Sequence, residues 1–377
     1  MIDISLIIMS AGNSTRFRKN TNIKKHWLRI DSKPLWLYVA DAISSRFTFD
    51  KVVITANKHE VKYMKKFCDY EIVEGGNSRQ ESLVNALEVV DSKFVLVNDA
   101  ARFDIDFSVL DDIFAQNINI YDCIVPTISA VDTILVCNVD GMKYLDRESV
   151  KLIQTPQLSR VSVLLEALKL GEFSDESSAI HSHGGRILTV NGSRSLNKLT
   201  FFDDIRNYNL DSTSDIHIGY GFDVHKFTSD KKMFLGGVFI DCGFGLEAHS
   251  DGDVLIHSLC DAILGAIGAG DIGDWFPNDS DEFKNIDSKI LLKRVMNLVS
   301  SVGFIIINVD IMIMAQIPSI SNYKSEIIEV LRSILNISKH SINIKATTME
   351  HMGFIGRKEG ICVSSNVSMK YSIVKNT

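Results

Sequence analysis

The sequence has no paired-cysteine motif, no long uncharged apolar run and no excess of positive charge. Its six cysteines are scattered without a C-x-x-C pair, which indicates reduced thiols in a cytoplasmic protein. No uncharged apolar run reaches the roughly 18 residues of a membrane span, and the apolar start carries Asp3 and lacks the basic region of a signal peptide. A formal net charge of -7 argues against a nucleic-acid-binding protein.

The 377 residues contain no internal repeat and no low-complexity tract. Their number, with a hydrophobic content of 45%, predicts two domains that each have a core. The short, polar and turn-rich segment 211–215 is predicted to be a linker. It separates a first domain, residues 1–210, from a second domain, residues 216–377.

The first half alternates apolar strands with helical patterns. Continuous apolar runs at 4–9, 51–56, 71–73 and 94–97 are typical of buried parallel strands, and a helical pattern covers 78–90. This order predicts an α/β domain with a doubly wound, mostly parallel, Rossmann-like sheet. In such sheets, ligands bind beyond the carboxyl ends of the strands.

Polar segments follow the predicted strands of this half: 10–16 after the first, 75–82 after the third and 98–102 after the fourth. The first of them is neither a P-loop nor a G-x-G-x-x-G motif, although its small residues can form an anion nest. The segment from 16 to 33 holds seven basic residues and one acid, which suits either a solvated face or a phosphate site. Asp99 can hold a divalent cation on phosphates or cap a helix.

A set of motifs occurs in a fixed order along this half. They are Ser10-Ala11-Gly12, Arg16, Lys25-His26-Trp27, Gly75-Gly76 with Ser82, Asp99-Ala100-Ala101-Arg102, Thr155-Pro156-Gln157, Ser174-Asp175-Glu176-Ser177-Ser178 and Lys198. In this combination, residues 4–210 resemble the methylerythritol-phosphate cytidylyltransferases. The resemblance implies that methylerythritol 4-phosphate attacks the α-phosphate of CTP and displaces pyrophosphate.

The resemblance also implies roles for individual residues. Fixed positive charge at the reacting phosphorus would come from Arg16 and Lys25. The residues that bind CTP, with Mg²⁺ or Mn²⁺ near the last of them, would be Ala11, Gly12, Ser82 and Asp99. The residues that hold the sugar phosphate, partly across a dimer interface, would be Arg102, Thr133, Arg147 and Lys198. The residues that depart from the family pattern are Ser14, where the family usually has glycine, and Lys24 and Phe103, where it has proline. Lys24 is an alternative to Lys25 as the catalytic lysine.

The second half opens on two metal-binding residue types spaced two apart. Asp223 and His225 follow a glycine-containing turn, and on a strand they would share one face. Together with His257 they offer one oxygen and two nitrogens and leave a coordination position open, as in catalytic zinc sites. The alternative for the first two residues alone is an edge strand with a solvated acid and a core histidine.

Further elements of this half alternate between helix and strand. The predicted helices cover 253–268, 288–302 and 319–335, the strands cover 305–314, 342–346 and 361–369, and a polar loop covers 271–279. This order predicts an α+β domain in which helices lie on a mixed sheet. Within it, Lys345-Ala346-Thr347-Thr348-Met349-Glu350 has the side chains that suit a metal–diphosphate complex.

Four motifs of the second half carry a second resemblance. They are Gly221-Phe222-Asp223-Val224-His225, Ala248 to His257, Gly270-Asp271-Ile272-Gly273 and Lys345-Ala346-Thr347-Thr348. In their order and spacing, residues 216–373 resemble the 2-C-methyl-D-erythritol 2,4-cyclodiphosphate synthases. The resemblance implies that the 2-phosphate of the substrate attacks the β-phosphate of its cytidine diphosphate unit and expels CMP.

This second resemblance implies two metal sites and a set of substrate contacts. The zinc ligands would be Asp223, His225 and His257, and Glu350 would hold a second divalent ion, Mg²⁺ or Mn²⁺. Substrate binding and transition-state stabilisation would come from His249, Ser250, Asp271, Gly273, Ala315, Thr348, Phe354 and Arg357.

The two resemblances also imply a homo-oligomer. The synthase family is trimeric and the first half would be dimeric, so a hexamer would satisfy both. A kinase acts between the two reactions of this isoprenoid-precursor pathway, and its association is compatible with the resemblance. The alternative to a bifunctional enzyme is a chain in which one half is inactive and serves as a nucleotide-binding scaffold for pathway enzymes.

Overall fold

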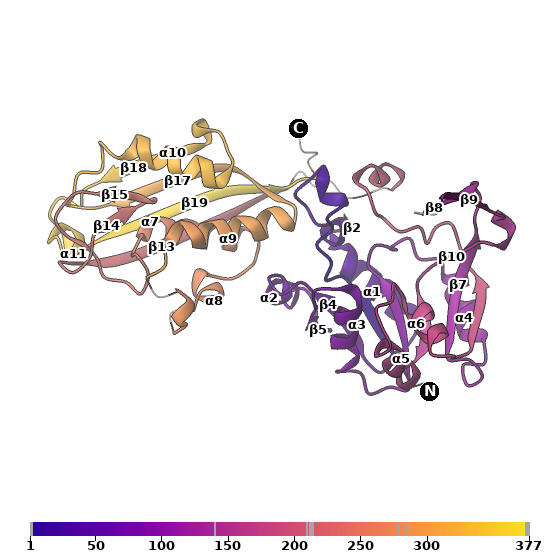
Figure 1. Cartoon of the computed structure of the whole chain (residues 1–377). Helices are drawn as coiled ribbons and strands as arrows, with labels where there is room; N and C mark the ends of the chain where they lie inside the picture. Colours follow the sequence, from indigo (N-terminus) through magenta and orange to yellow (C-terminus); the bar gives the residue numbers. More distant parts are fainter. Residues whose placement is uncertain are drawn as a thin grey trace. The chain divides into compact units, whose positions relative to one another are not determined.

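The computed structural model describes residues 3–138, 141–208, 210, 215–277, 279–283 and 285–373. The chain divides into two compact units, and the division falls within the segment predicted to be a linker (Figure 1). Apart from Asp215, the linker lies outside the described residues. Each unit is described by itself below.

The first unit is built on an eight-stranded sheet with the order β10-β7-β11-β6-β1-β4-β5 and with β12 paired to β7. The strands are β1 (Ile4–Met9), β4 (Val52–Ala56), β5 (Glu71–Glu74), β6 (Phe94–Asp99), β7 (Cys123–Ser129), β10 (Lys151–Ile153), β11 (Gln157–Arg160) and β12 (Ile187–Asn191). β1 is parallel to both β4 and β6, whereas β10 and β11 run antiparallel to their neighbours. The predicted mostly parallel α/β sheet is therefore confirmed.

The remaining elements of this unit are helices and two short hairpins. The α-helices are α1 (Leu35–Arg46), α2 (Val61–Met64), α3 (Arg79–Leu87), α4 (Phe107–Ala115), α5 (Val161–Leu168) and α6 (Glu176–Ser182). The 3₁₀-helices are η1 (Phe17–Lys19), η2 (Lys25–Trp27), η3 (Arg147–Ser149) and η4 (Phe202–Asn207). The hairpins pair β2 (Arg29–Ile30) with β3 (Lys33–Pro34), and β8 (Ile134–Asn138) with β9 (Gly141–Leu145).

Apolar side chains cover both faces of this sheet. Ile7 belongs to a core cluster with Leu83 of α3 and Leu164 of α5. Its neighbours Leu6 and Ile8 point to the opposite face and are also fully buried. This double burial explains why the strand is a continuous apolar run without alternation.

The sequence also predicts a helix around residues 200–210, and this prediction was wrong. The described residues of this segment form only the short η4 and no α-helix. The carboxylate of Asp204 accepts the backbone N–H groups of Thr200 and Phe201, each at 2.8 Å. Such local bonds from side chain to backbone compete with the α-helical ladder, which explains the short turn.

The second unit has a five-stranded mixed sheet with the order β16-β13-β19-β17-β18. Its strands are β13 (Ile216–Thr228), β16 (Gly245–Leu246), β17 (Phe304–Met314), β18 (Ile342–Thr347) and β19 (Gly360–Tyr371), and β14 (Met233–Leu235) pairs separately with β15 (Val238–Ile240). β13 and β17 flank β19 antiparallel to it, whereas β17 and β18 are parallel. This arrangement confirms the predicted α+β class.

Four helices of the second unit, α7, α9, α10 and α11, pack on this sheet, whereas α8 packs on α7 (Figure 1). They are α7 (Val254–Ala266), α8 (Ile272–Trp275), α9 (Ser288–Ser301), α10 (Lys324–Leu335) and α11 (Gly353–Gly356), with 3₁₀-helices η5 (Asp281–Phe283) and η6 (Lys339–Ser341). α10 begins five residues later than predicted, after a turn in which the N–H of Tyr323 bonds to the carbonyl of Ile320 at 3.0 Å.

The glycines before Asp223 lie inside β13, so the predicted turn at this place was wrong. A Cβ atom on Gly219 would lie 1.8 Å from the carbonyl oxygen of Ala262, and one on Gly221 would lie 1.9 Å from that of Ser258. Both carbonyls belong to α7. The glycines are therefore required because the helix backbone approaches the strand directly.

Candidate active sites

The three polar segments of the first unit meet at one edge of its sheet. Met9 at the end of β1 pairs with Asp99 at the end of β6, so the segments that follow these strands begin side by side. A Cβ atom on Gly75 would lie only 2.3 Å from Cβ of Ala11. The segments after β1, β5 and β6 are thus brought together, as the sequence predicts.

Asp99 is the buried centre of this cluster. Its Oδ2 lies 2.6 Å from Nζ of Lys198, and its Oδ1 lies 3.3 Å from Nε of Arg79. Burial alone would raise the pKa of the Asp99 carboxyl, but Arg79 and Lys198 outweigh it and hold the pKa well below its usual range. Asp99 is therefore a carboxylate whose two oxygens are both paired with cations of the chain.

Lys25 belongs to the same charge cluster, whereas Lys24 does not. Nζ of Lys25 donates to the carbonyl of Leu199 at 2.8 Å. Burial and the nearby Lys198 lower the pKa of Lys25 to about 8, although Asp99 counteracts them. Lys24 instead points to Glu60, with 2.8 Å between Nζ and Oε1.

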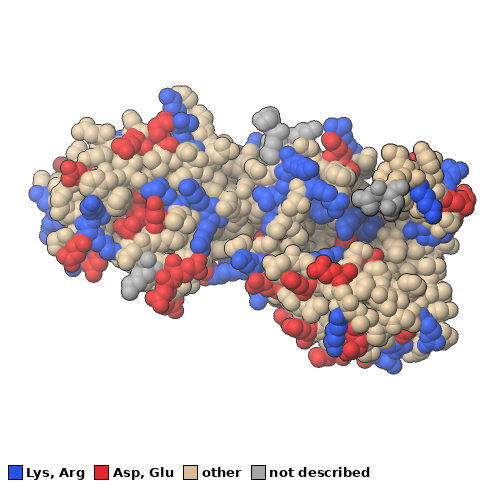
Figure 2. Space-filling view, in the orientation of Figure 1, with Lys and Arg blue, Asp and Glu red and all other residues tan. Residues whose placement is uncertain are grey.

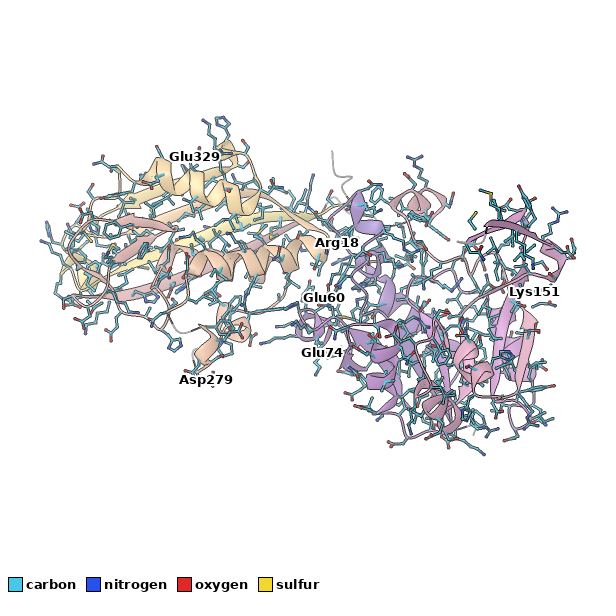
Figure 3. The ribbon with its side chains drawn as sticks, viewed as in Figure 1. Arg18, Glu60, Glu74, Lys151, Asp279 and Glu329 are labelled. Atoms are coloured by element: carbon cyan, nitrogen blue, oxygen red, sulfur yellow. The ribbon has the colours of Figure 1, made fainter. Side chains whose placement is uncertain are left out.

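Glu60 also binds His26, through Oε2 at 3.0 Å from Nε2 (Glu60 is labelled in Figure 3). All three side chains of this Lys24–Glu60–His26 triad are buried. Burial would raise the pKa of Glu60, but His26 and Lys24 outweigh it and lower the pKa to about 2. The triad fixes the residues on either side of Lys25.

Arg16 and Ser14 complete the segment after β1. Arg16 is exposed, with its guanidinium carbon 6.0 Å from the ring centre of Phe201. Ser14 has a left-handed backbone (φ 55°), the conformation that favours the glycine usual in the family. Its Oγ accepts the backbone N–H of Lys25 at 3.2 Å, a bond that glycine could not make. Figure 2 shows that Lys and Arg side chains gather on the first unit around this basic segment.

Two charged residues of this site had no predicted role. Arg79 contacts Asp99 and also donates from Nη1 to Oε1 of Glu176 at 2.8 Å. Glu176 is fully buried, and burial raises its pKa although Arg79 acts in the opposite direction. Glu176 belongs to a motif that carries the family resemblance, and Arg79 lies between Gly76 and Ser82 of another. Nothing in the sequence indicates that the two side chains pair with each other.

The predicted sugar-phosphate residues fall into two groups. Arg102 and Lys198 interact electrostatically with Asp99, and Arg102 also donates to the carbonyl of Leu196. Thr133 and Arg147 lie by the exposed β8–β9 hairpin, where Arg147 donates to the carbonyl of Val131 at 3.3 Å. The remaining predicted nucleotide contacts, Gly12 and Ser82, lie in the converging segments, and the Ser82 hydroxyl accepts the N–H of Gly76 at 3.1 Å.

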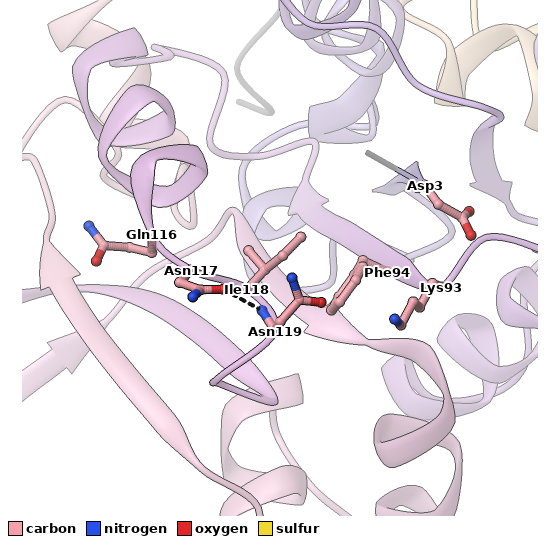
Figure 4. A pocket seen from close by; sticks show the side chains of 7 residues that line it. All are labelled: Asp3, Lys93, Phe94, Gln116, Asn117, Ile118 and Asn119. Atoms are coloured by element: carbon pink, nitrogen blue, oxygen red, sulfur yellow. Dashed lines mark hydrogen bonds between the residues drawn. The ribbon is translucent and has the colours of Figure 1, made fainter. Parts of the chain in front are cut away.

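A separate hollow of the first unit lies away from this cluster (Figure 4). Its lining residues are Asp3, Lys93, Phe94, Gln116, Asn117, Ile118 and Asn119. Phe94 is the first residue of β6, whereas Asp99 is the last. The hollow thus lies at the amino end of the strands, opposite to the edge where ligands bind in this class of sheet.

In the second unit, Asp223, His225 and His257 form a group that could hold a metal ion. Oδ2 of Asp223 lies 2.8 Å from Nε2 of His225 and 3.2 Å from Nδ1 of His257. Burial would raise the pKa of Asp223, but the bonds to the two histidines keep it well below its usual range. β13 supplies the first two side chains and α7 supplies the third.

The outer ring nitrogens of both histidines have hydrogen-bond partners. Nδ1 of His225 lies 2.8 Å from the carbonyl oxygen of Glu247. A carbonyl oxygen can only accept a hydrogen bond, so Nδ1 carries the ring proton and the lone pair of Nε2 is available for a metal ion. Nε2 of His257 faces the hydroxyls of Ser250 at 3.1 Å and Ser288 at 3.0 Å. One oxygen and two nitrogens with such outer partners fit a divalent metal with an open position, and they suit zinc.

Next to this group lie two predicted substrate-binding segments. Among the described residues, His249 has a buried Nε2 atom without a hydrogen-bond partner, which is suited to an incoming anion. Asp271 caps α8 by accepting the N–H of Asp274 at 2.8 Å, with Gly273 in the same turn. The carboxylate of Asp261 accepts the N–H of Ile272 at 2.7 Å and ties this turn to α7, a role that sequence analysis missed.

The predicted cytidine and second-metal residues lie where β17 and β18 end. Their last residues pair, and the N–H of Ala315 bonds to the carbonyl of Thr347 at 3.0 Å. The Thr348 hydroxyl donates to Glu350 at 2.7 Å, and Glu350 has a left-handed backbone (φ 47°). Strain of this kind is often found in functional loops.

Three other predicted residues of this unit are more exposed or are paired elsewhere. Lys345 bonds to Asp310 at 2.5 Å, so its ammonium is already paired within the sheet. Phe354 of α11 is partly exposed, and Arg357 pairs with Glu359 at 2.7 Å.

Comparisons with known proteins divide the chain in the same way. The profile described as 2-C-methyl-D-erythritol 4-phosphate cytidylyltransferase matches residues 4–209, and that of the YgbB family matches residues 216–370. A protein of Aliarcobacter butzleri named bifunctional enzyme IspD/IspF is 45% identical over 375 residues, which cover 98% of each chain. A protein of Wolinella succinogenes with the same name is 46% identical over 372 residues, which cover 98% of this chain and 97% of the relative.

A solved structure shows the same similarity over the whole chain. The bifunctional IspDF from Campylobacter jejuni matches with a TM-score of 0.81 and 46% identity, over 98% of this chain and 99% of that one. None of the helices that the structure describes combines the length and the apolar composition of a membrane-spanning segment. The chain belongs to the family of bifunctional IspD/IspF enzymes.

Proposed function

We propose that the chain catalyses two steps of the methylerythritol phosphate route to isoprenoid precursors. The first transfers CMP from CTP to 2-C-methyl-D-erythritol 4-phosphate and releases pyrophosphate. The second cyclises 4-diphosphocytidyl-2-C-methyl-D-erythritol 2-phosphate to the 2,4-cyclodiphosphate and releases CMP. The observation that carries the proposal is that each matched family region contains its own cluster of charged groups, centred on the buried Asp99 in the first region and on the half-buried Asp223 in the second.

In the first reaction, a phosphate oxygen of the sugar attacks the α-phosphorus of CTP, and the bond from that phosphorus to the pyrophosphate oxygen breaks. The attacking phosphate is already ionised, so the protein needs no strong base. Lys25 and Arg16 neutralise the charge on the crowded phosphorus, and the backbone of 11–15 cradles the triphosphate. Lys198 and Arg102 receive the sugar phosphate, and Asp99 lies near the divalent ion that accompanies CTP.

In the second reaction, an oxygen of the 2-phosphate attacks the β-phosphorus, and the bond from that phosphorus to the oxygen of CMP breaks. Asp223, His225 and His257 would hold zinc, and Glu350 would hold Mg²⁺ or Mn²⁺. These ions would orient the phosphates and neutralise their charge. The free Nε2 of His249 supports a contact to a substrate phosphate.

Five further residues complete the second substrate site. The Ser250 hydroxyl would join His249 on a phosphate, and the turn of Asp271 and Gly273 would hold the methylerythritol hydroxyls. Ala315 and Thr348 would lie by the cytidine diphosphate. The proposal for Ala315 and Thr348 is supported by their position at the joint end of two parallel strands.

Exposed apolar surfaces support a homo-oligomer. The outer face of β13 exposes Ile218 (72%), Tyr220 (62%) and Phe222 (50%), which suits a trimer of the second unit. The β8–β9 hairpin exposes Met142 (76%) and Tyr144 (70%), which suits a dimer of the first unit. In that dimer, Thr133 and Arg147 would reach the partner's site, and both contacts together would give a hexamer. All six cysteines are free thiols, in keeping with a cytoplasmic enzyme.

The alternative, in which one half is only a scaffold, is less well supported because both clusters retain their charged residues. Product analysis tests the proposal. The chain with CTP and methylerythritol 4-phosphate should release pyrophosphate, and addition of the intervening kinase and ATP should yield the cyclic diphosphate and CMP. If the cyclic diphosphate does not form with all components present, the bifunctional proposal is wrong.

A further inference from the structure

His257 presents its two ring nitrogens to different surroundings. Nδ1 lies in the metal-binding group, 3.2 Å from Oδ2 of Asp223. Nε2 faces the Ser250 and Ser288 hydroxyls at 3.1 and 3.0 Å. Behind Ser288 lies Asp251, whose Oδ1 receives the Ser288 hydroxyl at 2.5 Å. A hydrogen-bonded chain therefore runs from Asp251 through Ser288 to His257.

The available protons determine which atom donates and which accepts in each of these hydrogen bonds. The Asp251 carboxylate already accepts two backbone N–H groups, that of Ser288 at Oδ2 (3.0 Å) and that of Asp253 at Oδ1 (3.2 Å). An ionised carboxylate can only accept, so the single proton of the Ser288 hydroxyl goes to Asp251. The Ser288 oxygen can then only accept from His257, which places the ring proton on Nε2.

Ser250 does not decide the position of this proton. Its oxygen accepts the N–H of Gly252 at 3.2 Å, and its own proton stays uncommitted among these contacts. Ser250 could therefore either accept from Nε2 of His257 or donate to it. Ser288 removes that ambiguity because its proton is already used by Asp251.

We propose that Asp251 and Ser288 are positioning residues of the metal site. They hold His257 in the tautomer that carries its proton on Nε2 and leaves the Nδ1 lone pair for the metal. Partners of this kind typically contribute about 10- to 100-fold to metal affinity. The inference deepens the proposed function, since it rests on the metal-binding role of this group.

Neighbouring contacts hold Ser288 and Asp251 in position. Ser288 is completely buried and is the first residue of α9, which Asp287 caps by accepting the N–H of Lys289 at 2.9 Å. The backbone N–H of Asp251 donates to the carbonyl of Ile286 at 3.2 Å, which anchors Asp251 as well. Neither residue contacts Asp223 or His225 in the described hydrogen bonds, so both act through His257 alone.

Zinc affinity of the full-length chain tests the inference. The protein is stripped of metal, and the zinc dissociation constant is measured by competition with a chromophoric chelator. Ser288→Ala should weaken zinc binding about 10- to 100-fold, and Ser288→Thr, which keeps the hydroxyl, should restore most of it. Ser301→Ala is the matched control because it removes a buried hydroxyl from the other end of α9, where Oγ bonds to the carbonyl of Leu298 at 2.8 Å. It should bind zinc as the wild type does.

A second variant protects the test against a folding defect. Asp251→Asn has almost the same shape, but each carboxylate oxygen receives a backbone N–H, so the amide NH₂ meets a donor in either orientation. It should lower zinc affinity within the same range in a metal-free chain that still unfolds cooperatively on heating, although the unpaired amide lowers the unfolding temperature.

Two results would overturn the inference. One is unchanged zinc affinity in both Ser288→Ala and Asp251→Asn. The other is a loss that Ser301→Ala shares. Failure of the wild-type chain itself to bind zinc or to cyclise its substrate would instead refute the proposed function.

Discussion

The buried Lys24–Glu60–His26 triad allows a quantitative prediction for Glu60→Gln. The pKa of Glu60 is lowered from 4.5 to about 2. A shift of about 2.5 units, at about 1.36 kcal/mol each, is worth about 3 kcal/mol of stability. Because the folded-state pKa is lowered, this stability is complete above pH 4.5 and is lost as the pH falls towards 2. Glu60→Gln should remove it and leave the Lys24 charge buried without its carboxylate.

Denaturant unfolding followed by tryptophan fluorescence measures this effect. Two of the three tryptophans, Trp27 and Trp36, are buried in the first unit and report its unfolding. The variant should be about 3 kcal/mol less stable than the wild type at pH 7, and the difference should shrink to about 1 kcal/mol at pH 3.

The control is Asp111→Asn, which breaks the exposed pair with Arg46 and should cost less than about 1 kcal/mol. An effect of Glu60→Gln no larger than this control, or a difference that stays constant between pH 7 and pH 3, would refute the reasoning.

Three further predictions concern the two sites. Since the pKa of Lys25 is about 8, kcat/KM for CTP should fall as the pH rises through 8. Lys25→Arg should move that fall to higher pH. An identical pH profile in the variant would show that another group titrates. Ser14→Gly should relieve the left-handed backbone but lower the rate of CMP transfer several-fold, because the bond to the Lys25 N–H is lost, and unchanged steady-state kinetics would contradict this. Gly221→Ala places a methyl group 1.9 Å from a carbonyl oxygen of α7 and should destabilise the second unit by about 1–3 kcal/mol, measured by calorimetry, whereas Gly265→Ala, where a Cβ meets nothing within 4 Å, should not.

The parts of this structure that local pattern determines could be predicted from the sequence. The apolar run 4–9 became a strand buried on both faces, and the alternation at Asp223 and His225 put both side chains on one face. The polar segments met as predicted because parallel strands end at a common edge. In each case the information lies within a few residues or in the order of the elements.

What could not be predicted depends on partners distant along the chain. Nothing near Lys24 in the sequence indicates that Glu60 would pair with it, and this pairing is what separates its role from that of Lys25. The contact between Ser288 and His257 joins residues 31 apart. The glycines of β13 looked like a turn because the helix that requires them lies about 40 residues later.

β13 makes the second unit unusually intolerant of insertions and deletions. Its inward positions carry the glycines and the proposed metal ligands Asp223 and His225, while its outward positions carry Ile218, Tyr220 and Phe222. A one-residue change in register turns every side chain of a strand to the opposite face. If the strand keeps its register upstream, a single residue inserted before Gly219 would thus push Tyr220 and Phe222 against α7 and turn Asp223 and His225 away from His257. This strand can therefore change by substitution but not in length, because an insertion or deletion would disrupt the proposed metal site and the exposed apolar face together.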